Sequence, residues 1–182
     1  MCNKYGLKSS RKIRLHSVQE VLANADAEIR VDTRIKTDVK VQHNRPDILV
    51  LDKKRREITL IEVGITSQDL LKTVETEKAH KYDLLAGELG MLHKCSVKIV
   101  PYVMTWDGIV TKHHRRHAAT LGIPPNVESY IQTRVIKRTL EAVSFEARRS
   151  ICDEDGHTGR AEAAVERMLE AMTVQASETA TA

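Results

Sequence analysis

The chain has 182 residues, of which 30% are charged, 41% apolar and only 3% aromatic. This length suits one well-buried domain with extensions, and no apolar stretch is long enough to span a bilayer. The scarcity of aromatic side chains argues against a protein that stacks single-stranded bases on aromatic platforms. Three cysteines lie far apart, form no metal knuckle and indicate a reducing, intracellular setting.

The net charge of +4 is divided unevenly along the chain. From Asp153 onward seven acids and two arginines give −5, so the first 152 residues carry +9. A basic body of this size indicates a polyanionic partner, although a ribosomal or membrane-surface protein would share the property.

The N-terminal third is predicted to hold an arm, a helix and a strand. Residues 1–15 are basic and aperiodic, which predicts a flexible arm. The spacing of Ser17 and Glu20 matches a capping box and predicts a helix over about 17–25. Residues 28–41 alternate strictly between apolar or β-branched and charged side chains, which predicts a long, half-exposed strand.

Two short strands follow and bring two acids together. An apolar run opens at Asp47, a second covers 58–65, and the segment between them, 52–57, is a charged turn. This pattern predicts a β-hairpin with Asp47 and Glu62 on adjacent strands. The second strand is apolar on both faces, so Glu62 needs a metal ion or a buried cation as partner. The alternative is a turn aspartate and a strand glutamate paired with an arginine.

The rest of the chain is predicted to be mostly helical. We expect a helix over about 68–92, a strand over 96–105, a loop at 112–117 and a long helix over about 126–149. A polar linker over 153–159 and a weak helix over 160–173 complete the chain. The predicted domains are the arm (1–15), a core (16–123), a helix packing on or beside it (124–152), and an acidic linker, weak helix and frayed tail (153–182).

This order of elements predicts the fold class. A helix, three meandering strands, a crossover helix and a fourth strand give an α/β fold with a small mixed sheet of about four strands flanked by helices. Such a sheet can hold metal-binding acids at its strand ends. Hard divalent cations take carboxylate oxygens as ligands, and a bound cation can activate water and stabilise a phosphoryl transition state.

These motifs resemble the PD-(D/E)xK superfamily of restriction-endonuclease-like nucleases. The similarity is closest to the restriction-like endonuclease domain at the C-terminal end of site-specific non-LTR retrotransposon polyproteins. It is carried by Arg45-Pro46-Asp47-Ile48, by Glu62, and by the helix segment Glu77-Lys78-Ala79-His80-Lys81-Tyr82. The chain contains no reverse-transcriptase signature and no zinc knuckle, so it resembles only the last domain of such a polyprotein, as a separate or truncated reading frame.

The resemblance implies a role for each of these residues. Asp47 and Glu62 would bind Mg²⁺ or Mn²⁺. The superfamily expects a lysine two residues after the second acid, where this chain has Gly64. In the retrotransposon branch the lysine is thought to come from the following helix, which makes Lys78 or Lys81 the substitute, beside Tyr82. The alternative is that both lysines are solvated and the tyrosine belongs to the core.

Basic residues are candidates for contacts with nucleic acid. Lys112, Arg115 and Arg116 belong to the densest cationic run and would bind phosphates, unless the run is only a solvated loop. The histidines of this run lack an acid at ligand spacing. Arg45 would either bind phosphate or neutralise the acid pair. The basic turn at 53–56 is a further phosphate contact or a soluble hairpin tip.

The expected function is that of a divalent-metal-dependent endonuclease domain that hydrolyses phosphodiesters of double-stranded DNA. By resemblance, the cut would leave a 3′ hydroxyl that primes reverse transcription, with the rest of a polyprotein as partner. Such a protein would be intracellular, and nuclear in a eukaryote. Two alternatives stay open: a catalytically inactive nuclease-fold module that binds DNA or a protein, and a basic structural protein without nuclease ancestry.

Overall fold

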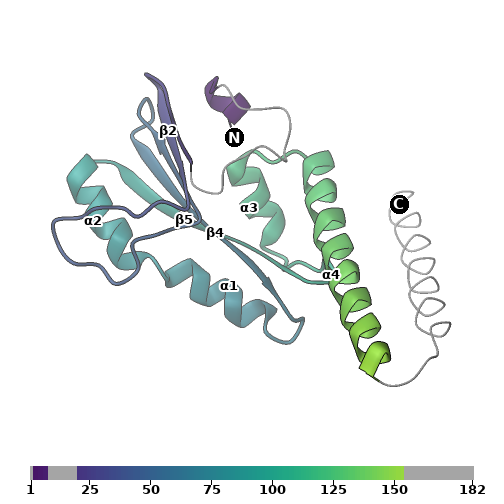
Figure 1. Cartoon of the computed structure of the whole chain (residues 1–182). Helices are drawn as coiled ribbons and strands as arrows, with labels where there is room; N and C mark the ends of the chain where they lie inside the picture. Colours follow the sequence, from purple (N-terminus) through teal and green to yellow (C-terminus); the bar gives the residue numbers. More distant parts are fainter. Residues whose placement is uncertain (1, 8–19, 154–182) are drawn as a thin grey trace. The chain divides into compact units, whose positions relative to one another are not determined.

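The computed structural model describes residues 2–7 and 20–153, which contain one five-stranded sheet and its helices (Figure 1). The elements, in chain order, are the 3-10 helix η1 (Cys2–Tyr5), β1 (Glu20–Ala23), β2 (Ala27–Val31), β3 (Ile48–Asp52), β4 (Glu57–Thr66), α1 (Leu71–His80), α2 (Asp83–His93), β5 (Ser96–Thr105), α3 (His114–Leu121) and α4 (Pro125–Asp153). The chain divides into two compact units after Ser129, so α4 beyond that residue is described by itself.

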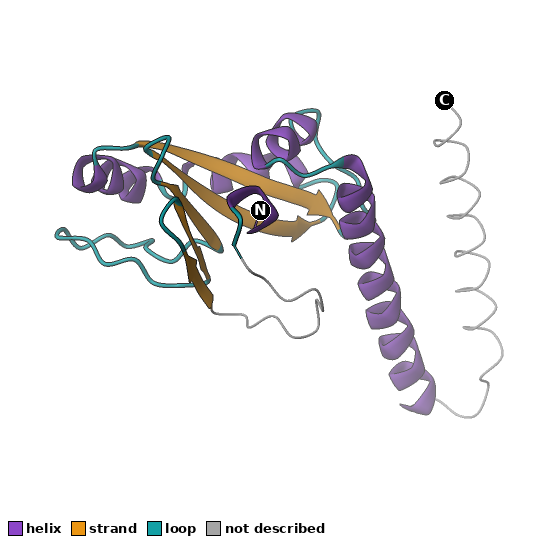
Figure 2. Ribbon diagram, turned by 90° about the horizontal axis from the view of Figure 1, so that it is seen from above, coloured by secondary structure: helices purple, strands orange, loops and turns teal. Residues whose placement is uncertain are grey.

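The sheet confirms the α/β class and corrects the number of strands. Its order is β1-β2-β3-β4-β5, with antiparallel neighbours up to β4 and a parallel pairing between β4 and β5. Five strands are present where about four were expected. Figure 2 shows β4 and β5, the two longest strands, running side by side.

The additional strand replaces the helix that was predicted over 17–25. Residues 20–23 form β1, which pairs with β2, while Ser17 lies outside the described residues. The turn between the two strands is held by Asn24, whose Oδ1 accepts the backbone N–H groups of Asp26 (2.9 Å) and Ala27 (2.7 Å). An asparagine that binds the backbone two and three residues ahead favours a tight turn, and this local chemistry outweighs the capping-box spacing.

The long strand predicted over 28–41 is also corrected. β2 ends at Val31, and Asp32 has a φ of +48°, which takes the chain out of the extended conformation. Residues 32–47 then form the long loop that lies beside α2 in Figure 1. Ile35 and Val41 from this loop are buried in the main core cluster, so their burial does not need a strand.

The hairpin of β3 and β4 was predicted correctly. Its register pairs Ile48 with Ile61 and Asp52 with Glu57, and the basic turn lies between the two strands. Two lysines of this turn are bound to the neighbouring β1–β2 turn, because Lys53 Nζ donates to the carbonyl of Asn24 (2.8 Å) and Lys54 Nζ lies 2.8 Å from Asp26 Oδ2.

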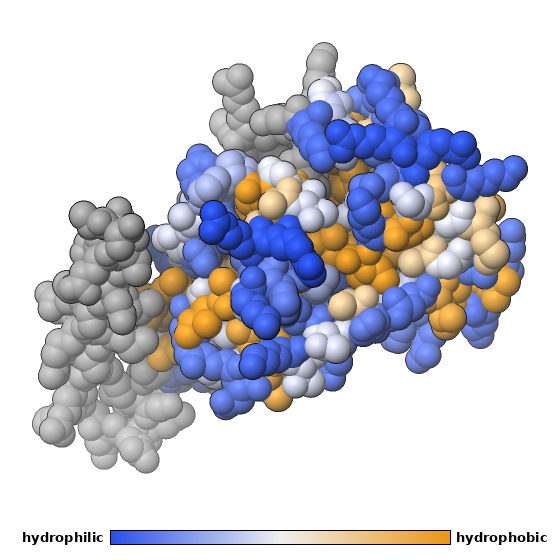
Figure 3. Space-filling model, turned by 180° about the vertical axis from the view of Figure 1, so that it is seen from behind, coloured by the Kyte–Doolittle hydropathy of each residue, from blue (hydrophilic) through white to orange (hydrophobic). Residues whose placement is uncertain are grey.

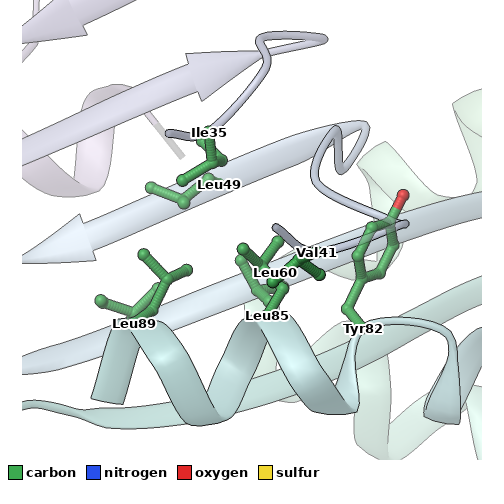
Figure 4. Packing of buried hydrophobic residues seen from close by; sticks show 8 residues of the cluster. Ile35, Val41, Leu49, Leu60, Tyr82, Leu85 and Leu89 are labelled. Atoms are coloured by element: carbon green, nitrogen blue, oxygen red, sulfur yellow. The ribbon is translucent and has the colours of Figure 1, made fainter. Parts of the chain in front are cut away.

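The crossover from β4 to β5 contains two helices where a single one was expected over 68–92. α1 ends at His80 and α2 begins at Asp83, because Tyr82 has a non-helical backbone (φ −111°, ψ 19°). Tyr82 is 2% exposed and packs with Leu85 and Leu89 of α2 against Leu60 of β4. Figure 4 shows the tyrosine at one end of this row, with its hydroxyl directed away from the aliphatic side chains.

The strand over 96–105 was predicted correctly, but the segment 112–117 is not the loop that was expected. Residues 112–113 form a turn, in which Thr111 Oγ1 accepts the N–H of His113 (3.2 Å), and 114–117 are the first four residues of α3. Gly122 ends the helix in a left-handed conformation (φ +65°). The long helix predicted over about 126–149 corresponds to α4. The linker and weak helix expected after it, and most of the predicted arm, lie outside the described residues.

The surface of the described residues mixes hydrophilic and apolar side chains. Leu84 and Met91 of α2 are 74% and 69% exposed. In Figure 3, which views the molecule from behind, apolar residues form separate patches among strongly hydrophilic ones. Within the described part of the chain, no helix is both long and apolar enough to cross a membrane.

Candidate active site

Asp47 and Glu62 lie opposite one another at the open end of the β3–β4 hairpin. The last ladder pair is Ile48 with Ile61, and one further step of the same register pairs Asp47 with Glu62. Directly opposed residues of antiparallel strands point to the same face of the sheet. Asp47 is fixed in place by its Oδ2, which accepts the N–H of Val63 (2.7 Å).

Glu62 is a buried carboxylate, 3% exposed, and three side chains from the α1–α2 junction bind it. Its Oε1 accepts hydrogen bonds from Lys78 Nζ (3.1 Å) and Lys81 Nζ (2.5 Å). Its Oε2 lies 3.0 Å from the hydroxyl of Tyr82, which is also 2.9 Å from the carbonyl of Arg45. The structure therefore brings Lys78, Lys81 and Tyr82 together at the second acid.

These contacts keep the group ionised despite its burial. Burial acts to raise the pKa of Glu62, but the hydrogen bonds from Lys81, Lys78 and Tyr82 outweigh it, so this pKa is below its usual value. Burial acts to lower the pKa of Lys81, but its hydrogen bonds and charge interactions with Glu62 and Tyr82 raise it. Burial, with Glu62 nearby, raises the pKa of Tyr82 to about 12, so its hydroxyl remains a donor near neutral pH.

Lys78 reaches the carboxylate by passing over Gly64. A Cβ atom at position 64 would lie 2.6 Å from Cε and 3.0 Å from Cδ of Lys78, closer than van der Waals contact allows. The side chain of Lys78 is only 21% exposed, against 36% for Lys81. The position two residues beyond the second acid is thus filled by the stem of a helix lysine.

The carboxylate pair fits a hard divalent cation in its chemistry. Mg²⁺ is commonly held by one or two carboxylates, with water and substrate phosphate completing its coordination. Among the described residues no group of three or more His, Cys, Asp or Glu side chains could hold a metal, so Asp47 and Glu62 would have to bind it as a pair. A cation there would compete with both lysines for Glu62.

Arg45 lies beside this pair but makes its ion pair elsewhere. Its Nη2 is 2.7 Å from Asp32 Oδ2, and its Nε donates to the carbonyl of Asp32 (3.2 Å). Its side chain is 46% exposed, so the guanidinium stays accessible to a phosphate.

The cationic run at the start of α3 divides into exposed and buried residues. Lys112, Arg115 and Arg116 are exposed, as phosphate contacts require, whereas His114 is 1% exposed. The ring of His114 packs 4.6 Å from that of Tyr102 on β5. Its Nε2 lies 3.1 Å from Glu128 Oε1, but without the geometry of a hydrogen bond.

A buried acid that sequence reasoning missed connects α1 to α3. Glu75 is 8% exposed and accepts a hydrogen bond from the hydroxyl of Thr111 (2.6 Å). His117 Nδ1 lies 3.6 Å from the same carboxylate oxygen. Leu71, Glu75 and Lys78 are spaced as one helical face, a signal that would have placed the acid on the inner side of α1.

No family model and no curated protein matches this chain in sequence. Its function is therefore inferred from the residues of the site.

Proposed function

We propose that the chain is a divalent-metal-dependent DNA endonuclease domain with a restriction-endonuclease-like core, of the kind found in retrotransposon proteins. In this proposal Asp47 and Glu62 bind Mg²⁺ or Mn²⁺ and the substrate is double-stranded DNA. When bound, the cation would activate a water molecule and stabilise the charge that develops on the phosphate.

The observation that carries the proposal is the convergence of two helix lysines on a buried strand glutamate, opposite a second acid. An aspartate, a glutamate and an ammonium group are the parts that phosphodiester hydrolysis needs: metal ligands and a positioned cation near the reacting water. The passage of Lys78 over Gly64 supplies that cation where the strand itself has no side chain.

The protein's own residues can do three things in this reaction. The raised pKa of Lys81 keeps its amine protonated near neutral pH, so it balances the negative charge of Glu62. The hydroxyl of Tyr82 donates a hydrogen bond to Glu62 Oε2 and so restrains the orientation of this carboxylate. The exposed cations Lys112, Arg115 and Arg116 would hold the DNA backbone by charge.

A second candidate function follows from the hydrogen bonds that Lys78 and Lys81 already make to Glu62. Both of its oxygens have protein partners, and two ammonium groups already compensate its charge. A nuclease-fold module in which lysines have permanently replaced the metal would bind DNA or a protein without cleaving. Cleavage itself distinguishes the two candidates.

The test is nicking of supercoiled plasmid with Mg²⁺ or Mn²⁺ by the wild type, Asp47→Asn and Asp52→Asn. Both aspartates accept a backbone N–H, Asp47 from Val63 and Asp52 from Arg55, and asparagine preserves such an acceptor. Asp52 lies at the other end of the hairpin and is the matched control. We expect metal-dependent nicking by the wild type and Asp52→Asn and none by Asp47→Asn.

Two results would contradict the proposal. If the wild type does not nick with either metal while still binding duplex DNA, the inactive module is the better account. If Asp47→Asn nicks as fast as the wild type, the activity resides elsewhere.

A further inference from the structure

Gly64 and the stem of Lys78 occupy one space, and this pairing distinguishes the two lysines that bind Glu62. A Cβ at position 64 would come within 2.6 Å of Lys78 Cε, while its third neighbour, Val103 Cγ2, would lie at an ordinary 3.4 Å. Lys81 is not among these neighbours. A side chain at position 64 would therefore meet Lys78 first, because two of the three nearest atoms belong to Lys78 and none to Lys81.

We propose that Gly64 is a positioning residue whose missing side chain admits Lys78, and that Lys78 rather than Lys81 is the lysine that assists the attacking water. The inference rests on the proposed function for its catalytic part. Its structural part, the dependence of Lys78 on Gly64, stands without it.

The surroundings of the two amines favour this assignment. Lys78 projects from the inner face of α1, and its stem is held between the helix and β4. Lys81 stands at the end of α1, is more exposed, and lies with its Nζ 5.0 Å from the centre of the Tyr82 ring. Because the side chain of Lys78 is already restrained, it loses less conformational entropy when its amine is held in a fixed catalytic position. Lys78 is therefore the better ordered of the two lysines.

The expected effect of Gly64→Ala is catalytic more than structural. The colliding atoms belong to the far end of a flexible side chain, which can swing aside without a shift of the backbone, and Lys81 and Tyr82 would still bind Glu62. The amine of Lys78 would then leave Glu62 Oε1. The turnover number on duplex DNA should fall toward that of Lys78→Ala, which we expect about 10²–10⁴-fold below wild type, while KM stays unchanged.

The experiment is a double-mutant cycle of Gly64→Ala with Lys78→Ala, repeated with Lys81→Ala. In the Lys78→Ala background the colliding Cδ and Cε atoms are absent, so adding Gly64→Ala should not lower the turnover number further. In the Lys81→Ala background Lys78 is intact, so Gly64→Ala should lower the turnover number by the same factor as in the wild type. Gly64→Lys combined with Lys78→Ala returns a lysine to the strand and should cleave faster than Lys78→Ala alone. Additive losses of Gly64→Ala and Lys78→Ala would overturn the inference.

A matched control accompanies the kinetic test, and an NMR measurement tests the same contact without requiring cleavage. A Cβ added to Gly87 on α2 would meet no atom within 4 Å, so Gly87→Ala should leave turnover unchanged. By NMR, we expect a contact between the Gly64 Hα and Lys78 Hε protons, and Gly64→Ala should shift the Lys78 signals while leaving those of Lys81 in place.

The outcomes separate the two proposals. Unchanged Lys78 signals in Gly64→Ala would overturn the positioning role whether or not the protein cleaves DNA. Shifted signals in a protein that never cleaves would support the positioning role and refute the proposed function. If Gly64→Ala fails to fold while Gly64→Ala with Lys78→Ala folds, the rescue supports the shared space directly.

Discussion

Glu62 combines two properties that rarely coexist, near-complete burial and full ionisation. Desolvation of an isolated carboxylate in a sheet would cost several kcal/mol, and the two lysines and the tyrosine hydroxyl offset that cost. Breaking such a pair by removing one partner leaves an uncompensated charge. The α1–α2 junction is therefore tied to β4 through this one side chain.

The first prediction concerns the pH dependence of stability that Glu62 produces. Its pKa is lower in the folded protein than the ordinary 4.5, so its stabilising effect is present above about pH 4.5 and disappears as the pH falls through the lowered folded value. The pKa of Lys81 is raised above 10.5, so its contribution disappears as the pH rises through that raised value.

Urea unfolding of the wild type and Glu62→Gln between pH 2.5 and 11 measures this effect (about 1 pH unit per step suffices). The difference in free energy of unfolding should be largest between about pH 4.5 and 10.5 and shrink on both sides. A difference that stays constant across the acidic limb would show that the ion pairs do not stabilise the fold.

At this scale the sequence predicted the need of Glu62 for a cation, because an acid within an apolar strand has few ways to remain charged, while the metal-binding role of Asp47 and Glu62 stays a prediction. It left open whether Lys78 or Lys81 assists the attacking water, and the structure brings both amines to Glu62. The positions of the two amines depend on the break between α1 and α2 and on the free space over Gly64. Both are tertiary properties that no local pattern encodes.

Among the elements, α3 joins the exposed cations to the helix that carries the lysines. Its exposed side has Arg115 and Arg116, while its buried side has His117 facing Glu75 of α1. Burial, opposed by Glu75 and aided by the neighbouring Arg116, lowers the pKa of His117, so this histidine is mostly neutral near pH 7. The face of α3 that packs against α1 therefore carries a neutral histidine, and the solvent-exposed face carries the arginines.

The second prediction tests the exposed cations before and on α3. Replacing Lys112, Arg115 and Arg116 by glutamine should weaken binding to any duplex and flatten the plot of log affinity against log salt by about 2–3 units, because each lost phosphate contact contributes roughly 0.9. Fluorescence anisotropy over a range of salt concentrations measures the slope.

The basic hairpin turn supplies the matched control, with Lys53, Lys54 and Arg55 replaced by glutamine. The two lysines are already bound to Asn24 and Asp26, so this triple variant should change the slope less. If it flattens the slope more than the α3 variant does, the DNA is held at the other end of the sheet.

The errors at this scale have physical causes in particular side chains. The charged run 112–117 suggests a loop because its apolar periodicity is weak, whereas Thr111 and Gly122 mark both ends of a helix. The alternation over 28–41 suggests a strand, but Val39 is 58% exposed while Ile35 and Val41 are buried, so this segment does not bury its apolar positions as one strand face. The β3–β4 hairpin and β5 were predictable because turn chemistry and apolar runs agree there.

Over the whole molecule, charge is segregated along the chain. The first 152 residues carry +9 and the remainder −5. An acidic segment covalently attached to a basic body competes with DNA for its cations at low ionic strength, and salt screens this competition.

The third prediction follows from this competition. Replacing Glu162, Glu166 and Glu170 by glutamine raises the formal net charge from +4 by three and should tighten duplex binding at about 50 mM salt, with the effect fading near roughly 0.5 M. Aspartate at the same positions preserves the charge and should leave affinity unchanged. Tighter binding that persists at high salt, or that aspartate also produces, would point to a cause other than charge.

Binding of Mn²⁺ to the full chain at pH 7 tests the central claim most directly, namely that Asp47 and Glu62 jointly hold a divalent cation. Isothermal titration with the wild type should give one site that is lost in both Asp47→Asn and Glu62→Gln and retained in Asp52→Asn. Lys81→Met should bind the ion more tightly than the wild type, because one competitor for Glu62 is removed. Equal Mn²⁺ affinity in the wild type, Asp47→Asn and Glu62→Gln would contradict the account, because the ion would then bind elsewhere.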